Sequence, residues 1–482
     1  MSIDHPRNTN PPDPPVFSPQ NPWVQGRLLE LDILDLSPTG DGVGRWGAQN
    51  QVVFVPNTVP GDRIQARLVR VKPRYAHGQL HAIIQPSPHR VRPHCMVADK
   101  CGGCQWQPVA YAYQLVAKQN QVVQALERIG QFPSPNVDAV LAAESPLGYR
   151  NKVTYPVIFS PNSQRVQAGY YRKGSHKLIN LNQCPVQDPQ FDPFLAEIKT
   201  DVQQQGWSIY NEQNHQGLIR HLSLRIGRRT GEILMTLIIN AKPSQASQLL
   251  ANFEAQAQKW LEHYPQLVGV CLNFNSHRTN RIFGKDTVNI VGRNYLYETF
   301  AGLTFQLRPD TFFQVHTEQA EVLLKTLCAH LQLTGTEQVV DVYCGIGTLT
   351  LPLARQVKEI IGIEAQAAAI DQAETNTALN DITNATFRVG AAKDCLKELP
   401  FTPDLVILDP PRKGCHQSVL EQLLAISPQR IVYVSCHPAT LARDLNRLCQ
   451  SGPYDLNRVQ PVDFFPQTSH VECVAFLHRS AS

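Results

Sequence analysis

The sequence predicts an α/β chain of several domains: a small N-terminal β-barrel, a mixed α+β central domain and a C-terminal doubly wound domain. Its 482 residues are enough for about three domains of ordinary size. Glycine-punctuated stretches that alternate apolar and polar residues predict short strands near the N-terminus. From residue 302 onward, strand-like and helix-like segments alternate, which is typical of a parallel sheet covered by helices. The expected boundaries give a tail and three domains: 1–22, 23–87, 88–300 and 301–482.

The composition excludes several classes of protein. Hydrophobic residues make up 42% of the chain and charged residues 17%, so packed cores can form. A formal net charge of +4 is too small to indicate nucleic-acid binding by itself. The chain lacks an apolar run of about 18 residues, so we expect no membrane span. Twelve cysteines without a secretory leader indicate a reducing compartment, and we expect a cytoplasmic protein.

The N-terminal part combines a proline-rich tail with strand signals. Residues 1–22 hold seven prolines and few apolar residues, which predicts a disordered tail. Strands are expected at 24–36, 51–55 and 63–71, with glycines and Pro60-Gly61 at the turns between them. These strands predict a small all-β barrel of about 65 residues with a basic face.

Basic residues gather in two stretches. Seven lie between Gly61 and Arg92, where Asp62 is the one acidic residue. The second stretch consists of Arg220, Arg225, Arg228 and Arg229. Such clusters suit phosphates, because each neutralised phosphate releases condensed counterions. A solvated surface is the common alternative for a charge run.

The central and C-terminal domains are expected to contain the following elements. Central helices are expected at 110–129 and near 245–260, and central strands at 150–157, 221–226 and 233–239. In the C-terminal domain the predicted helix is 317–331 and the predicted strands are 338–343, 359–363, 404–408 and 430–434. A further strand carries Glu472 near the C-terminus.

A nucleotide-type site is indicated where the first strand of the C-terminal domain meets its turn. The apolar run before Tyr343 leads into Gly345-x-Gly347, and glycines there allow backbone to approach a ligand closely. About 20 residues on, Glu364 ends the next apolar strand, where a carboxylate can accept ribose hydroxyls. The third glycine of a pyrophosphate-binding turn is missing, which favours S-adenosylmethionine over a dinucleotide. A plain βα turn is the alternative.

Asp409-Pro410-Pro411 follows the next apolar strand. Two prolines after a strand end it and form a rigid wall. Sequences of this type border the target base in several methyltransferases. Taken alone, the motif also fits methylation of a ring nitrogen or an exocyclic amine, or a stiff loop without a role in chemistry.

Cys436 and Glu472 change this interpretation. Cys436 stands at the end of the following strand, and Glu472 lies in His470-Val471-Glu472. Uracil C5 is a poor nucleophile, but a thiolate that adds at C6 places electron density on C5. After methyl transfer, a base must remove the C5 proton. One thiol and one carboxylate are the groups that this pathway requires.

Four other cysteines have metal-ligand spacing: Cys95, Cys101, Cys104 and Cys184. Four thiolates suit zinc or an iron–sulfur cluster. The single distant cysteine is unlike paired zinc knuckles, which repeat Cys-x2-Cys twice, and this favours [4Fe–4S]. Core cysteines without metal are a further alternative.

Together these residues resemble the RNA 5-methyluridine methyltransferase family, in particular its cluster-containing branch that acts on 23S ribosomal RNA. The resemblance covers nearly all of the chain after the tail. It implies that the barrel is a TRAM domain and that the four spaced cysteines bind the cluster. Residues 435–444 match the family's nucleophile motif and residues 463–472 its base motif. The cofactor residues implied by the match are Gln314, Tyr343, Glu364 and Asp409.

The resemblance also implies an RNA partner and a monomer. The chain has Thr348 where many members have asparagine, and Asp394 lies near the position of an adenine-holding residue without matching it. Three alternatives stay open: a uridine in transfer RNA, C5 of cytosine, and an RNA-binding assembly factor without activity. For cytosine, a cysteine is expected directly after the two prolines, where Arg412 stands instead.

Overall fold

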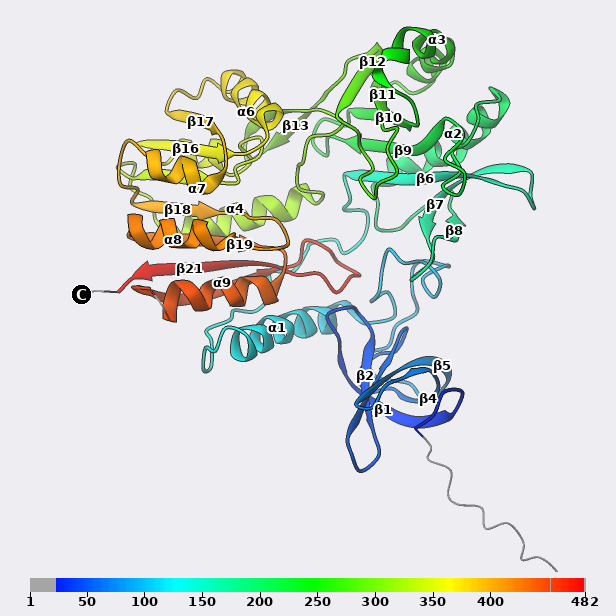
Figure 1. The fold of residues 1–482 in the computed structure, drawn as a ribbon, viewed down its shortest axis with the longest axis horizontal. Helices are drawn as coiled ribbons and strands as arrows, with labels where there is room; N and C mark the ends of the chain where they lie inside the picture. Colours follow the sequence, from blue (N-terminus) through cyan, green and yellow to red (C-terminus); the bar gives the residue numbers. More distant parts are fainter. Residues whose placement is uncertain (1–22, 451, 481–482) are drawn as a thin grey trace, which may run out of the picture. The chain divides into compact units, whose positions relative to one another are not determined.

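The computed structural model describes residues 23–450 and 452–480 (Figure 1). The tail predicted over residues 1–22 lies outside the described residues. The chain divides into two compact units. Among the described residues, one unit contains 23–37 and 41–88, and the other contains 38–40, 89–450 and 452–480. In the described part of the chain, every helix is too short or too polar to span a lipid bilayer.

The first unit is a closed five-stranded barrel with the strand order β1-β2-β3-β5-β4. Its strands are β1 (Leu28–Leu36), β2 (Gly42–Trp46), β3 (Gln51–Val55), β4 (Arg63–Val71) and β5 (Tyr75–Gln85). On β1, Leu29, Leu31 and Ile33 point into the core while the residues between them are exposed, as the period of two requires. The basic residues of β4 and the turn after it are exposed, so this part of the first basic stretch, Arg63 to Arg74, lies on the barrel's outer surface.

The central part of the second unit is a seven-stranded mixed sheet in the order β12-β11-β10-β9-β6-β7-β8. Its strands are β6 (Lys152–Ser160), β7 (Arg165–Tyr171), β8 (Leu178–Asn180), β9 (Ile219–Ile226), β10 (Ile233–Ile239), β11 (Leu267–Phe274) and β12 (Asp286–Gly292). Its helices are η1 (Pro189–Phe191), α2 (Asp192–Gln204), η2 (Pro243–Gln245) and α3 (Ala246–His263). Phe194 of α2 and Phe253 of α3 belong to one core with Leu224 and Met235, so both helices cover the same face.

A hairpin of β13 (Leu296–Phe300) and β14 (Leu303–Leu307) leads into the C-terminal sheet, whose order is β17-β16-β15-β18-β19-β21-β20. Its strands are β15 (Gln338–Val342), β16 (Glu359–Glu364), β17 (Ala385–Val389), β18 (Leu405–Leu408), β19 (Arg430–Ser435), β20 (Tyr454–Val462) and β21 (Glu472–Arg479). The first five of these strands are parallel, and β21 runs antiparallel to both β19 and β20.

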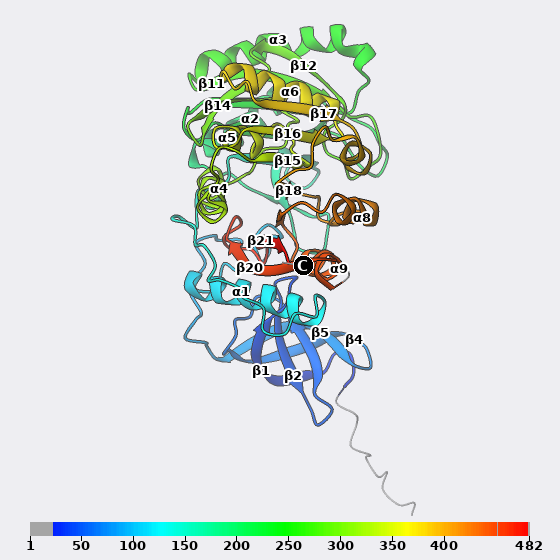
Figure 2. The ribbon, with the colours of Figure 1, turned by 90° about the vertical axis from the view of Figure 1, so that its left-hand side faces the viewer.

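Helices cover both faces of this sheet. They are α1 (Tyr111–Arg128), α4 (Thr317–Leu331), α5 (Thr350–Ala354), α6 (Ala367–Leu379), α7 (Ala392–Cys395), η3 (Leu396–Glu398), α8 (Gln417–Ile426) and α9 (Pro438–Gln450). Figure 2 shows α4 on one side of the sheet and α8 and α9 on the other. Val339 of β15 packs in the core with α4, whereas Val340 packs with α8 and α9, because successive strand residues face opposite ways.

The strand order reverses beside β15, which has β16 on one side and β18 on the other. In open α/β sheets, ligands bind at the carboxyl ends of the strands on either side of such a reversal. The predicted fold class is therefore confirmed for the barrel and for the C-terminal domain. The predicted helices 110–129 and 317–331 correspond to α1 and α4.

Two arginines of the second basic stretch are paired with carboxylates. Arg228 donates to the carboxylates of Asp188 and Glu318, and Arg229 forms a 2.7 Å ion pair with Glu321. These acids lie 40 to 92 residues away in the sequence. Counting charges in the local sequence therefore does not reveal that the guanidinium groups of Arg228 and Arg229 are neutralised.

Candidate active site

In the turn after β15, the main chain borders space that no protein atom fills. Gly345 and Gly347 have φ of +55° and +85°, in the left-handed region that favours glycine. A Cβ added at Gly345 would have no atom within 4 Å. Tyr343 is also left-handed, with φ 70°, which is costly for a residue with a side chain. Strained backbone beside open space is typical of a ligand-binding turn.

A buried carboxylate lies under this turn. Asp341 is 1% exposed, and its Oδ2 accepts a hydrogen bond of 2.5 Å from Thr350 Oγ1. Burial raises the pKa of Asp341 to about 6. Among the described residues its Oδ1 has no hydrogen-bond partner. A buried acceptor without a partner fits a ligand that brings donors, as the amino and hydroxyl groups of S-adenosylmethionine do.

The predicted cofactor residues follow neighbouring strands. Glu364 ends β16, Tyr343 follows β15 and Asp409 follows β18, so all three lie at one edge of the sheet. Glu364 interacts electrostatically with both Asp341 and Tyr343. Burial and then Asp341 raise the pKa of Asp409 to about 7. Gln314 precedes α4, and its carbonyl oxygen accepts a 2.8 Å hydrogen bond from a side chain of the central domain, Asn151 Nδ2.

Cys436 lies between the end of β19 and the start of α9. Its thiol is half-buried, and burial is the main reason that its pKa is raised to about 11. Glu472 and Asp409 act in the same direction, while the guanidinium of Arg412 lowers the pKa. The structure thus brings Cys436, Glu472, Asp409 and Arg412 together, although they come from three different strand ends.

Glu472 is the first residue of β21 and is 5% exposed. Burial raises its pKa well above the usual range, Asp409 raises it further, and Arg412 opposes both effects. In its deprotonated form, a carboxylate with a raised pKa binds an abstracted proton more strongly than an exposed glutamate does. The site therefore holds a thiol and a basic carboxylate side by side, beside a turn that suits S-adenosylmethionine.

Comparison with known families agrees with this geometry. A family model described as tRNA (Uracil-5-)-methyltransferase matches residues 111–480, and a TRAM domain model matches residues 22–81. The chain belongs to the tRNA (uracil-5-)-methyltransferase family. Members of this family are RNA (uracil-5-)-methyltransferases, so the protein is an enzyme that transfers a methyl group from S-adenosylmethionine to C5 of uracil in RNA.

Relatives of this uracil-5-methyltransferase are similar over their whole length. A protein of Nostoc sp. described as an uncharacterized RNA methyltransferase is 60% identical over 460 residues, which is 95% of this chain and 98% of the relative. A protein of Bacillus cereus with the same description is 37% identical over 459 residues, or 95% and 98% of the two chains.

One solved structure is similar throughout. The Pyrococcus abyssi tRNA (uracil-54, C5)-methyltransferase in complex with S-adenosyl-L-homocysteine has a TM-score of 0.73 and 26% identity. The match covers 93% of this chain and 100% of that one. S-adenosyl-L-homocysteine is what remains of S-adenosylmethionine after methyl transfer.

The four spaced cysteines of this family member line a single cavity in the central part of the second unit. Cys95, Cys101 and Cys104 come from the loop before α1, and Cys184 comes from the loop after β8. Burial raises the pKa of Cys104 to about 11 and that of Cys184 to about 12. In residues 23–450 and 452–480, no three His, Cys, Asp or Glu side chains are arranged to hold a single metal ion. The cluster therefore stays a prediction.

Several residues that support the site were not predicted. Asp444 of α9 accepts hydrogen bonds from Cys415 N (2.8 Å) and Tyr433 Oη (2.6 Å) and thereby fixes the loop after Pro410-Pro411. Lys118 of α1 reaches the loop before Glu472. Asp444 lies within the nucleophile motif, which is the signal that could have identified it. Lys118 has no such signal, because a lysine in a helix is normally taken as exposed.

Proposed function

We propose that this enzyme methylates C5 of a uridine in 23S ribosomal RNA, with Cys436 as the nucleophile and Glu472 as the base. The observation that carries these roles is the register of β19 and β21, which sets Ser435 opposite Cys473 and so brings Cys436 and Glu472, the next residue on each side, to the same place. To reach a site at this depth, the target uridine must leave its stack in the RNA.

In the first step, the thiolate of Cys436 forms a bond between Sγ and C6 of the uracil. The electrons of the C5–C6 double bond move into an enolate that is nucleophilic at C5. Arg412 supports this step, because its charge favours the thiolate form of Cys436. S-adenosylmethionine supplies the methyl group that C5 receives.

In the second step, Glu472 takes the proton from C5. The electrons of the C5–H bond restore the C5–C6 double bond, and the Sγ–C6 bond breaks with its electrons returning to Cys436. The burial of Glu472 supports this role, because it raises the pKa of the carboxyl and so its affinity for the proton. Both groups return to their starting states through loss of the proton from Glu472 to solvent.

Four residues are proposed to bind S-adenosylmethionine: Gln314, Tyr343, Glu364 and Asp409. Glu364 suits the ribose hydroxyls, because it ends the strand beside the glycine turn. Asp409 lies between the turn and Cys436 in the order of the strand ends, so it suits the part of the cofactor that faces the uracil.

We also propose that Cys95, Cys101, Cys104 and Cys184 hold a [4Fe–4S] cluster. Their position around one cavity supports a shared group. The single distant cysteine, Cys184, is unlike paired zinc knuckles, which repeat Cys-x2-Cys twice, and this favours the cluster over zinc. When bound, the cluster would join the loop before α1 to the loop after β8.

These cysteines support the ribosomal target. The sequence resembles a branch of the family that has this cysteine pattern, and that branch acts on 23S ribosomal RNA. Transfer RNA is the second candidate. It is favoured by the overall similarity to the Pyrococcus abyssi enzyme, which acts on tRNA at uracil 54.

Mapping 5-methyluridine in cells with and without this protein decides between the two targets. We expect the loss of the protein to remove 5-methyluridine from at least one position of 23S ribosomal RNA and to leave transfer RNA unchanged. Restoring the wild-type chain should restore the modification, and restoring the Cys436→Ala chain should not. Loss of 5-methyluridine from transfer RNA alone would contradict the ribosomal assignment and support the second candidate.

The proposed cluster can be tested by measuring the metal content of protein purified without air. We expect about four irons and about four acid-labile sulfides per chain, with broad visible absorbance from thiolate-bound iron. Cys104→Ser should lose most of this iron, while Cys328→Ser, a change at a thiol of α4, should retain it. One zinc ion per chain without sulfide would show that the cysteines form a zinc site instead.

A further inference from the structure

We propose that Lys118 of α1 is a positioning residue for Glu472. It fixes the 463–471 loop, which joins β20 to β21 and ends at the carboxylate. The inference rests on the proposed function, in which Glu472 removes the proton from C5.

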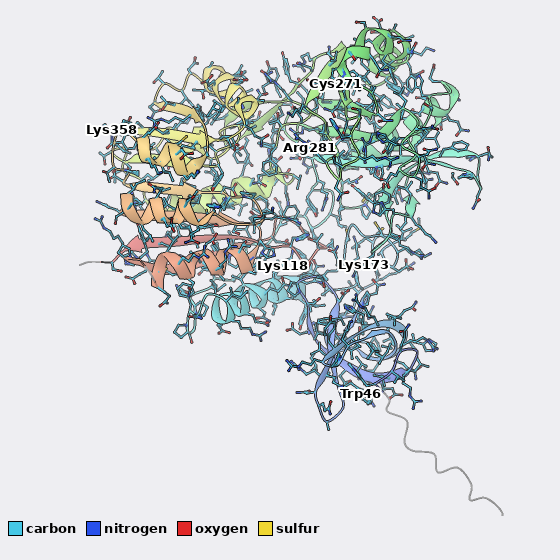
Figure 3. All side chains as sticks on the ribbon, viewed as in Figure 1. Trp46, Lys118, Lys173, Cys271, Arg281 and Lys358 are labelled. Carbon is cyan, nitrogen blue, oxygen red and sulfur yellow. The ribbon has the colours of Figure 1, made fainter. Side chains whose placement is uncertain are left out.

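The contact of Lys118 with the 463–471 loop is direct and buried. Lys118 Nζ lies 2.5 Å from Asp463 Oδ1 and 3.0 Å from the carbonyl oxygen of Phe465. The side chains of Lys118 and Asp463 are both 0% exposed. Lys118, which Figure 3 labels, thus joins α1 to a loop 345 residues later in the sequence.

A second residue of α1 holds the middle of the same loop. Gln114 is one helical turn before Lys118, so both side chains lie on the same face of the helix. Gln114 exchanges two hydrogen bonds with Gln467, of 2.9 Å to its backbone N and 3.1 Å to its side chain. Gln467 has φ 68°, a left-handed conformation that costs free energy for a residue with a side chain.

Contacts from other segments also fix the loop. Tyr149 Oη donates to the carbonyl oxygen of Pro466 at 3.1 Å, and Trp106 N donates to that of Gln467 at 3.0 Å. A strained residue persists where the surroundings over-determine it, and here the surroundings are α1 and its neighbours. The loop conformation is therefore imposed from outside the β20–β21 hairpin.

The choice of a lysine is informative. A buried ion pair contributes little net stability, because both charges lose their water, and an apolar residue of similar length often packs as well. Lys118 differs from an apolar residue because its hydrogen bonds are directional. Its ammonium group fixes the positions of one carboxylate and one carbonyl oxygen. A base that moves by about 1 Å can lose roughly 10²-fold in rate. The loop that precedes Glu472 is a place where this precision matters.

The test separates base positioning from nucleophile chemistry. We expect Lys118→Met to slow the removal of the C5 proton roughly 100-fold. With a uridine-containing transcript of the target RNA, a methylated protein–RNA adduct should then accumulate on denaturing gels. With the same transcript made with 5-fluorouridine, which has no C5 proton, the adduct should form close to the wild-type rate.

Two further variants control for folding. Lys118→Met/Asp463→Leu leaves no unpaired charge and should show the same adduct accumulation as Lys118→Met. Gln119→Met removes hydrogen bonds from α1 to Val137 and Asp138, not to the 463–471 loop, and should release RNA normally. Thermal unfolding midpoints of all three show which variants are folded.

Three outcomes would overturn the inference. Both Lys118 variants could release RNA at the wild-type rate. Both could lose adduct formation and release in equal proportion, which would indicate a general structural role. Gln119→Met could accumulate the adduct as strongly as Lys118→Met. Failure of the proposed function looks different, because wild-type protein would then form no adduct with the 5-fluorouridine transcript.

Discussion

Cys436→Ala is expected to abolish both uridine methylation and the covalent adduct with RNA that contains 5-fluorouridine. Without the thiolate, C5 gains no electron density, and loss of a nucleophile commonly costs roughly 10⁴-fold or more in rate. The measurement is transfer of labelled methyl groups to the RNA, together with adduct formation on denaturing gels. Cys449→Ala, at the other end of α9, is the matched control and should retain both activities. An adduct that persists in Cys436→Ala would contradict the mechanism.

The same adduct reports the charge state of Cys436. Burial and the neighbouring carboxylates raise the pKa of Cys436 to about 11, so the thiol is protonated at neutral pH in the free enzyme. In the proposed mechanism the thiolate is the nucleophile, and the thiolate fraction of Cys436 grows about tenfold per pH unit below that value. We therefore expect the rate of adduct formation to rise continuously between pH 7 and pH 9. A rate that is flat over this range would show that the bound substrate lowers the pKa below 7.

The strands at the site could be predicted from the sequence because their signals are local. A buried parallel strand is a short apolar run bounded by a turn, and β15, β16, β18 and β19 all have this form. The functional groups follow these strands directly, so their clustering at one edge follows from the topology. Cys436 was predicted in this way, whereas Glu472 begins β21, which runs antiparallel to β19 and therefore starts at the same end of the sheet.

What could not be predicted depends on contacts between distant segments. Lys118 interacts with Asp463, and Arg228 with Glu318, and in each case the local sequence shows a charge but not its partner. Strand β11 is different, because Leu267–Phe274 is an apolar run that the pattern could have revealed. It lies parallel to β10, with α3 as the connection between them, and so belongs to the central sheet.

Glu472→Gln is expected to stop the reaction after methyl transfer rather than before it. A glutamine can occupy the same space but cannot take the C5 proton, and loss of a general base costs about 10² to 10⁴-fold. The enzyme should therefore accumulate a methylated covalent adduct with ordinary uridine RNA, measured by gel shift with labelled methyl groups. Glu421→Gln, an exposed change on α8, should release its product normally.

This variant distinguishes the roles of the two groups in a way that a simple loss of activity cannot. The Sγ–C6 bond forms without Glu472, so Glu472→Gln should react with RNA that contains 5-fluorouridine about as fast as the wild type. Cys436→Ala should react with neither RNA. If Glu472→Gln instead turned over normally, another group would have to remove the C5 proton. Asp409 would be the first candidate, since it is the other carboxylate that interacts electrostatically with Cys436.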